Sequence, residues 1–248
     1  MKFNYKDVGK EIGWNFSTMK HTTEQDSPYY YYHKVVEYIQ PDTVMLDLGC
    51  GSGEKSTKYF GLAKKIIMVD NEPEMLKKAK ENVEKFYNEN KASKFEFQIG
   101  DADGRLDYAD ETFDLVVSRH CGGNMHEIYR VLKKGGVFIS EDIDDIDCLE
   151  LKEYYNRGQN YPLDKTQKEK IFQDIFDAGF SEIKLLNFDQ REYYPNIEEL
   201  IFLLDHTPII DGYDEENDRE TLEKYCKDFI TEKGVLLKRR LYAFELKK

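Results

Sequence analysis

Short apolar runs alternate with helical stretches from residue 44 to about residue 140, and this alternation restricts the possible folds more than any other feature. Five of the runs have the length and composition of β-strands, at residues 44–48, 65–69, 95–99, 113–118 and 137–140. Regular alternation of strands and helices is typical of a parallel sheet with helices on both faces. We therefore expect an α/β fold.

The spacing of apolar residues predicts five helices, at residues 28–39, 54–61, 73–90, 124–133 and 165–178. Pro73 suits the first turn of its helix, and Gly179 ends the last one. Three- and four-residue steps place one apolar set on a single face of the 73–90 helix: Met75, Leu76, Ala79, Val83 and Phe86.

Two more strands are expected near the C-terminus, at residues 181–188 and 236–246. The connection between them, residues 194–234, contains two amphipathic helical stretches. A connection of about forty residues is long for a loop, and such connections are usually functional or form a subdomain.

A glycine-rich stretch, LDLGCGSG at residues 46–53, lies where the first strand turns into its helix. Glycines there let backbone N–H groups approach a ligand, and the helix N-terminus favours bound groups. Asp70 ends the second strand, where an acid about 20 residues after the glycines can accept hydrogen bonds from ribose hydroxyls. The combination predicts a ligand that contains adenosine.

The details of this stretch distinguish among such ligands. The third glycine comes one place too early for a dinucleotide fingerprint, and no Lys follows as in a P-loop. Asp47 and Glu54 flank the loop with negative charge, which would repel a pyrophosphate and suit a cation. S-adenosylmethionine carries a sulfonium and an amino group and no phosphate, so it is the favoured ligand.

The sequence resembles the class I S-adenosylmethionine-dependent methyltransferases, in particular their small-molecule, type 11/25-like branch. The resemblance spans about residues 31–180 and includes IGDA at 99–102, FDLVVS at 113–118 and YRVLKKGG at 129–136. It implies a Rossmann-like seven-stranded sheet, mostly parallel, with an antiparallel last strand and a helical lid. The expected division is an N-terminal cap (1–40), a core (41–193), the lid (194–234) and the final strand (235–248).

The resemblance also implies roles for individual residues. The glycines would wrap the amino-acid part of the cofactor, Asp47 would lie near its amino group, and Asp70 would hold the ribose. Asp101 and Ala102 would face the adenine. The complete expected set is Asp47, Gly49, Cys50, Gly51, Gly53, Asp70, Asn71, Asp101, Ala102 and Ser118.

The fourth strand is followed by Arg119 and His120, at the edge of the sheet where ligands gather in open α/β folds. His120 is a candidate base or substrate-orienting residue, or it packs on the cofactor or the next helix. Arg119 would clamp an acidic substrate or form a structural salt bridge. The stretch lacks the Asn/Asp-Pro-Pro-Tyr pattern of the branch that methylates planar amines.

The charge of the chain restricts the class of methyl acceptor and the binding of a metal. The net charge of −13 argues against a large nucleic-acid footprint, and residues 238–240, a short basic run, read as a solvated strand end. The acidic run at residues 141–147 invites a magnesium site, but no spaced partner carboxylate supports one. We expect this run to be solvated and no metal to bind.

Four scattered cysteines, without a CxxC pair, indicate a reducing cytoplasm. The N-terminal residues lack the apolar stretch of a signal peptide, and no run spans a membrane. Trp14 and the run of tyrosines at residues 29–32 would pack the N-terminal cap or reach the cofactor.

Taken together, these features of the sequence predict methyl transfer to a small molecule. The alternatives are an RNA or tRNA methyltransferase and a protein that binds the cofactor without catalysis.

Overall fold

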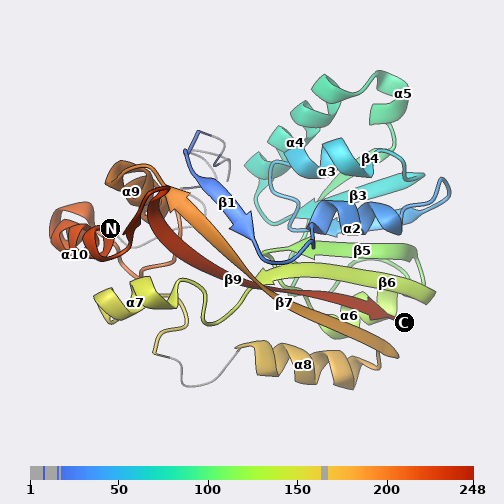
Figure 1. Cartoon of the computed structure of the whole chain (residues 1–248). Coiled ribbons are helices and arrows are strands. Elements are labelled where there is room, and N and C mark those ends of the chain that lie inside the picture. Colours follow the sequence, from blue (N-terminus) through green and yellow to red (C-terminus); the bar gives the residue numbers. More distant parts are fainter. Residues whose placement is uncertain (1–7, 9–15, 17, 163–166) are drawn as a thin grey trace.

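The computed structural model describes residues 8, 16, 18–162 and 167–248, which form one mixed sheet of nine strands flanked by helices (Figure 1). Five adjacent strands, which end at the edge strand β4, are parallel, in the order β6-β5-β2-β3-β4. They are β2 (Val44–Leu48), β3 (Lys65–Asp70), β4 (Phe95–Ile99), β5 (Phe113–Arg119) and β6 (Leu132–Ile143). The α/β class and the five parallel strands are therefore confirmed.

The C-terminal strand, β9 (Gly234–Lys247), lies antiparallel between β6 and β7 (Glu182–Tyr194), as expected. Both β7 and β9 are longer than predicted and extend beyond the central strands. Their projecting parts pair with two short strands, β1 (Thr22–Gln25) and β8 (Ile230–Thr231). The described sheet consequently has nine strands where seven were expected.

The two faces of the sheet carry different helices. On one face, alternate side chains such as Met45, Ile66 and Met68 pack against α2 (Tyr31–Glu37), α3 (Glu54–Phe60) and α4 (Pro73–Phe86). The intervening residues, such as Leu46 and Ile67, face α6 (Met125–Val131) and α8 (Gln167–Ala178). The two-residue period of a strand therefore covers both faces with apolar side chains.

The helix predicted at residues 73–90 is divided in two. Pro73 begins α4, which ends at Phe86, and a separate short helix, α5 (Glu89–Ala92), follows with Asn88 as its N-cap. Four residues of the predicted apolar face of α4 are buried, whereas the fifth, Phe86, is exposed. A cap that satisfies the first N–H groups of α5 explains the new start.

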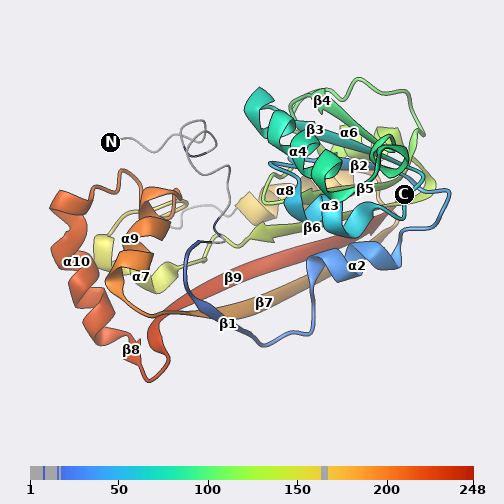
Figure 2. The same cartoon turned by 90° about the horizontal axis from the view of Figure 1, so that it is seen from above.

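Three helices gather at the far end of β7 and β9, beyond the carboxyl end of β6 (Figures 1 and 2). They are α7 (Leu149–Tyr155), α9 (Ile197–Asp205) and α10 (Glu215–Asp228), and we call them the lid helices. They share an apolar cluster that includes Leu151, Leu204, Leu222 and Leu237. The two helices predicted within 194–234 are confirmed, whereas α7 was not predicted.

The tyrosine run is divided between core and surface: Tyr31 is buried, and Tyr30 is exposed. Trp14 lies outside the described residues. The four cysteines, all described, are free thiols. Within the described residues, no helix is both long and apolar enough to cross a membrane.

Candidate functional site

The loop after β2 has the backbone shape that its glycines allow. Gly49, Gly51 and Gly53 all have positive φ, and Gly53 is the N-cap of α3. The loop is held to β3 because the Cys50 N–H donates to the Val69 carbonyl (3.0 Å). A Cβ atom added to Gly51 would meet no atom within 4 Å, so the space next to this residue is open.

Asp70 closes this loop from the end of β3. Its Oδ2 accepts from the Gly51 N–H (2.8 Å), and its Oδ1 accepts from the Glu72 N–H (3.0 Å). Burial raises the pKa of Asp70, although these backbone donors oppose the rise. The neighbouring Asn71 is exposed. The structure thus brings Asp70 and the glycine loop together, as the spacing predicts.

Asp47 lies beneath the same loop and is almost completely buried. Burial raises the pKa of Asp47 to about 7, a hydrogen bond from Ser56 opposes the rise, and the charge of Asp70 adds to it. Its Oδ2 has no hydrogen-bond partner. A buried carboxylate oxygen without a donor is costly, and a cationic group would satisfy it. This oxygen and the open space at Gly51 fit the amino-acid part of S-adenosylmethionine.

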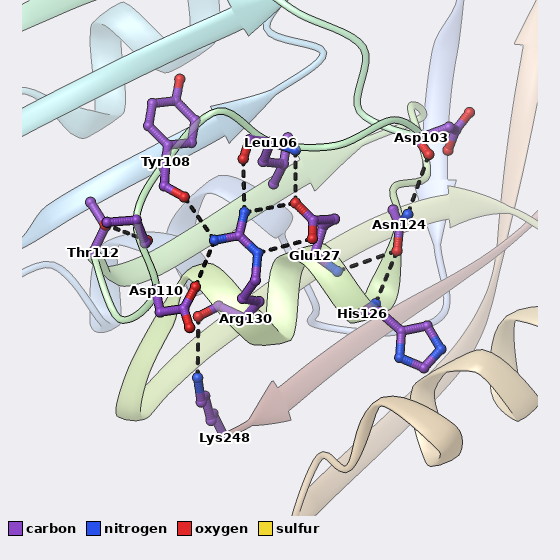
Figure 3. Close-up of polar contacts among 11 residues, drawn as sticks. Asp103, Leu106, Tyr108, Asp110, Thr112, Asn124, His126, Glu127, Arg130 and Lys248 are labelled. Atoms are coloured by element: carbon purple, nitrogen blue, oxygen red, sulfur yellow. Dashed lines mark hydrogen bonds and ion pairs between the residues drawn. The ribbon is translucent and has the colours of Figure 1, made fainter.

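The loop after β4 carries Asp101 and Ala102. Asp101 is exposed, and its Oδ1 accepts from the Asp103 N–H (3.0 Å). Ala102 packs in the core, and its carbonyl accepts from the Asn124 N–H (2.9 Å). The Asn124 side chain also donates to the Asp103 carbonyl and caps α6 (Figure 3). Asn124 therefore joins the loops after β4 and β5, a role that the sequence did not reveal.

Arg130 of α6 holds the chain between β4 and β5 in place (Figure 3). Its guanidinium donates to the carbonyls of Leu106 (2.8 Å) and Tyr108 (2.7 Å) and pairs with Glu127 and Asp110. The hydrogen bonds from Arg130 keep the pKa of Glu127 near 2. Arg130 belongs to the YRVLKKGG motif, but only the structure shows which segment it supports.

Ser118 lies near the carboxyl end of β5, and His120 is the first residue of the loop that follows this strand. Ser118 is buried, and its hydroxyl donates to the Gly122 carbonyl (2.8 Å). His120 has left-handed backbone (φ 56°), and its N–H donates to the Glu141 carbonyl (2.9 Å). Left-handed backbone at a non-glycine residue costs about 1–3 kcal/mol and is often found at functional sites.

His120 as a whole residue is exposed, although protein atoms crowd its imidazole. The surrounding protein lowers the pKa of His120 well below its usual range, and the charges of Arg119 and Arg239 lower it further. The ring is therefore neutral near pH 7, in the state that accepts a proton.

Arg119 forms an ion pair with the buried carboxylate of Glu141 through its Nε (2.7 Å). Its guanidinium also lies over the ring of Tyr32, 5.8 Å from the centroid. These contacts match the structural salt bridge that was one of the two expectations for this residue.

The expectation that the acidic run 141–147 is solvated is wrong. Asp144 pairs with Lys168 (2.6 Å), and Asp145 accepts from Asn160 (3.1 Å). Asp147 is buried and pairs with Arg239 (3.0 Å). Within the described residues, no group of three His, Cys, Asp or Glu side chains is arranged to hold a metal ion.

The expectation of a solvated basic strand end at residues 238–240 is also wrong. Arg239 is enclosed between Asp147 and Glu192. Lys238 and Arg240 flank it and both pair with Glu150, at 3.0 and 2.7 Å. The acidic and basic runs neutralise each other, because β9 passes beside the chain that leaves β6.

A parallel α/β sheet with this glycine loop, an acid at the end of the second strand and an antiparallel last strand defines a class I S-adenosylmethionine-dependent methyltransferase. Residues 39–199 match a family model described as a methyltransferase domain, and the chain belongs to that family. The chain therefore contains a domain of the family that uses S-adenosylmethionine as its methyl donor.

The chain is similar to two methyltransferases over part of their lengths. It is 35% identical over 121 residues to arsenite methyltransferase of Halobacterium salinarum, covering 44% of this chain and 29% of that protein. It is 32% identical over 148 residues to ribosomal protein L11 methyltransferase of Thermosipho africanus, covering 57% and 52%. The chain therefore spans about half the length of these relatives or less.

The fold is also similar to that of a methyltransferase-like protein from Bacillus halodurans C-125. The TM-score is 0.62 at 19% identity, and the match covers 88% of this chain and 98% of that protein. At this identity the likeness concerns the fold alone.

Proposed function

We propose that this methyltransferase acts on a small molecule that binds between the loop after β5 and the lid helices. The observation that carries the proposal is the position of His120. Its imidazole is neutral, the residue is exposed, and its backbone is strained. It lies at the carboxyl ends of the parallel strands, where the sheet adjoins the lid helices. On this proposal residues 194–234 form the substrate lid, which packs against α7 of a core of residues 41–193 that 235–248 completes. Residues 1–40 form an N-terminal cap.

The loops after β2, β3 and β4 would hold the cofactor. Asp47 would face the amino group, the backbone of Gly49, Cys50, Gly51 and Gly53 would enclose the amino-acid part, and Asp70 with Asn71 would bind the ribose. Asp101 and Ala102 would border the adenine, and Ser118 would shape the loop next to the reacting group. When bound, the cofactor supplies a methyl group on a sulfonium, which is already a good leaving group.

The protein's own contribution would be alignment and proton removal. His120 would accept the proton that an acceptor such as an alcohol or thiol loses as it is methylated. Arg119 would act through its neighbour: its charge helps to keep the imidazole neutral, and Glu141 holds both the Arg119 side chain and the His120 N–H. We therefore assign His120 the catalytic role and Arg119 a positioning role.

Charge supports a small acceptor over a nucleic acid. The chain has a net charge of −13, and the basic run beside the site is paired with carboxylates. Binding to a phosphate backbone needs unpaired Lys and Arg side chains. One relative is named for arsenite, which is a small acceptor. Another is named for a ribosomal protein, so a protein acceptor is the alternative to test.

The first experiment titrates S-adenosylmethionine into the purified chain by calorimetry, with NAD as the control ligand. We expect micromolar binding that NAD does not reproduce. Asp70→Ala should weaken it by about tenfold or more, because a charged hydrogen-bond acceptor is lost. Asp42→Ala, which removes an exposed carboxylate before β2, should bind like the wild type.

The second experiment screens acceptors by release of S-adenosylhomocysteine. Turnover of a small molecule would support the proposal. Turnover only with RNA or a protein would contradict the small-molecule assignment. Cofactor binding without turnover of any acceptor class would favour the non-catalytic alternative.

A further inference from the structure

Arg239 is the centre of a polar network between the central sheet and the lid helices. Its Nε donates to both carboxylate oxygens of Asp147 (3.0 and 3.1 Å). Its Nη1 makes longer contacts of 3.4 Å with Glu192, which also accepts from the Tyr194 hydroxyl (2.6 Å). Within the described residues, the Nη2 of Arg239 donates no hydrogen bond. Part of this guanidinium therefore remains available.

Lys152 lies on α7 beside this network. Its backbone N–H donates to the Cys148 carbonyl one turn earlier, next to Asp147 (3.0 Å). The residue is only 3% exposed, and its stem packs against Gly158. No described side chain or carbonyl accepts a hydrogen bond from its Nζ or forms an ion pair with it. Burial lowers the pKa of Lys152, although Cys148 and Asp147 oppose the change.

An ammonium group in a buried residue without a protein partner is expensive unless its nitrogen keeps contact with solvent or with a ligand. Lys152 Nζ and Arg239 Nη2 have no hydrogen-bond partner among the described residues, but neither nitrogen is fully enclosed by protein. Both nitrogens therefore reach accessible space. Each is a donor only, and neither is able to accept a hydrogen bond.

The surrounding carboxylates are already occupied. Asp147 accepts from Arg239 and from the Arg240 N–H, and Glu192 accepts from Tyr194. Asp145, whose charge raises the pKa of Lys152, accepts hydrogen bonds from Asn160 and from a backbone N–H. The donors of this cluster that have no acceptor are thus Lys152 Nζ and Arg239 Nη2, and such cationic donors suit an anion.

The cluster adjoins the candidate base. The charge of Arg239 lowers the pKa of both His120 and Lys152. Arg239 lies on β9 next to the chain that leaves β6, and His120 follows β5, the other neighbour of β6.

We propose that Lys152 Nζ and Arg239 Nη2 bind an anionic group, a carboxylate or a phosphate, of the methyl acceptor. This inference rests on the proposed function, because it places the acidic end of a small acceptor on the lid side of the site. The accepting atom then faces His120. The acceptor is accordingly a small organic acid or a phosphate ester.

The test uses the full chain loaded with S-adenosylhomocysteine and measures the rate at which Lys152 is acetylated at pH 8. Peptide mass spectrometry follows Lys152, with the exposed Lys227 of α10 as the internal control. We expect succinate or inorganic phosphate to slow acetylation of Lys152 by about tenfold, because each forms charge-assisted hydrogen bonds with the amine. Succinamide should have no effect, and Lys227 should react equally in all cases.

The two anions identify the source of the charge. Protection by succinate alone indicates a carboxylic acid, and protection by phosphate alone indicates a phosphorylated acceptor. If neither anion slows the reaction, or succinamide is as effective as succinate, the inference is wrong.

A variant separates binding from folding. Lys152→Met should unfold at the same temperature as the wild type or higher, because it removes an unpaired buried charge. It should also lose the calorimetric heat of binding of the protecting anion, which Lys227→Met should retain. Unchanged anion binding by Lys152→Met would overturn the inference. An acceptor screen without small-molecule turnover would instead refute the proposed function and leave the anion result standing.

Discussion

Gly49 and Cys121 lie in direct contact: a Cβ atom added to Gly49 would stand 2.3 Å from Cys121 Sγ and 2.4 Å from Cys121 Cβ. Gly49 belongs to the loop after β2, and Cys121 directly follows His120 in the loop after β5. The contact therefore joins the proposed cofactor loop to the loop that carries the candidate base. Only a residue without a side chain allows the two loops to approach so closely.

Alanine at two glycines of the same loop should separate packing from ligand binding. Gly49→Ala should lower the free energy of unfolding by about 2–5 kcal/mol, through overpacking and positive φ together. Gly51→Ala meets no neighbouring atom and should cost only about 1–2 kcal/mol. It should nevertheless weaken S-adenosylmethionine binding by about tenfold or more, because its methyl group enters the open space. Urea unfolding and calorimetry measure the two effects, and normal cofactor binding by Gly51→Ala would refute this placement.

The buried carboxyl of Asp47 should make stability depend on pH. Its pKa is raised to about 7 from 3.8, so between these values the folded state holds a proton that the unfolded state has lost. Stability of the wild type should therefore fall as pH rises through this window, by up to about 4 kcal/mol, relative to Asp47→Asn. Urea unfolding at pH 4 to 8 measures the difference, and a constant difference would contradict the prediction.

The same group should make cofactor binding tighter as pH rises through about 7, because only the ionised carboxylate attracts the amino group. Asp47→Asn should lose this dependence. Asp142 is the matched control, since burial also raises its pKa to about 7. Asp142→Asn should keep the dependence, and calorimetry in buffers of different pH distinguishes the two carboxyls.

Replacing His120 by Asn should lower kcat about 100-fold or more, the typical contribution of a general base. Asn is chosen because it tolerates the left-handed backbone at this position. Cofactor affinity should remain within about twofold of wild type, since a role in proton transfer is separate from binding. His126→Asn, on the exposed surface of α6, is the control and should be fully active. Little loss in His120→Asn would reduce His120 to a packing residue.

Arg239→Met should destabilise the fold by about 3–5 kcal/mol, because Asp147 and Glu192 would remain buried without their cation. Lys238→Met removes a charge from the adjacent, half-exposed position and should cost less than about 1 kcal/mol. Urea unfolding at pH 7 compares the two variants. Equal stabilities would mean that Asp147 and Glu192 find other partners.

Local patterns in the sequence predict most of the fold. The strands at 44–48 and 95–99 have the predicted bounds. The first is almost wholly buried and mostly apolar, whereas the second lies at the edge of the sheet and alternates apolar and polar residues. The glycines of LDLGCGSG and Asp70 could also be placed, since a turn after one strand and the end of the next necessarily share an edge of the sheet.

Long-range pairings could not be predicted. Asp147 and Arg239 are 92 residues apart, and nothing in either charged run identifies the other as its partner. The bounds of β7 could not be predicted either, because its length depends on its pairing with β9 and β1. Helix α7 was missed since its apolar face meets α10, which comes about sixty residues later in the sequence and is a neighbour only in the folded structure.

By itself, the sequence determined the order of strands and helices, the glycine loop and the cofactor that suits it, since each depends on residues close together in the chain. Only the tertiary structure decided that two opposite charged runs bury each other, that Cys121 packs on Gly49, and that Lys152 lies beside Arg239 without a partner of its own. These relationships depend on which distant segments the sheet brings together, and the free energy of a buried charge is set by its neighbours in space.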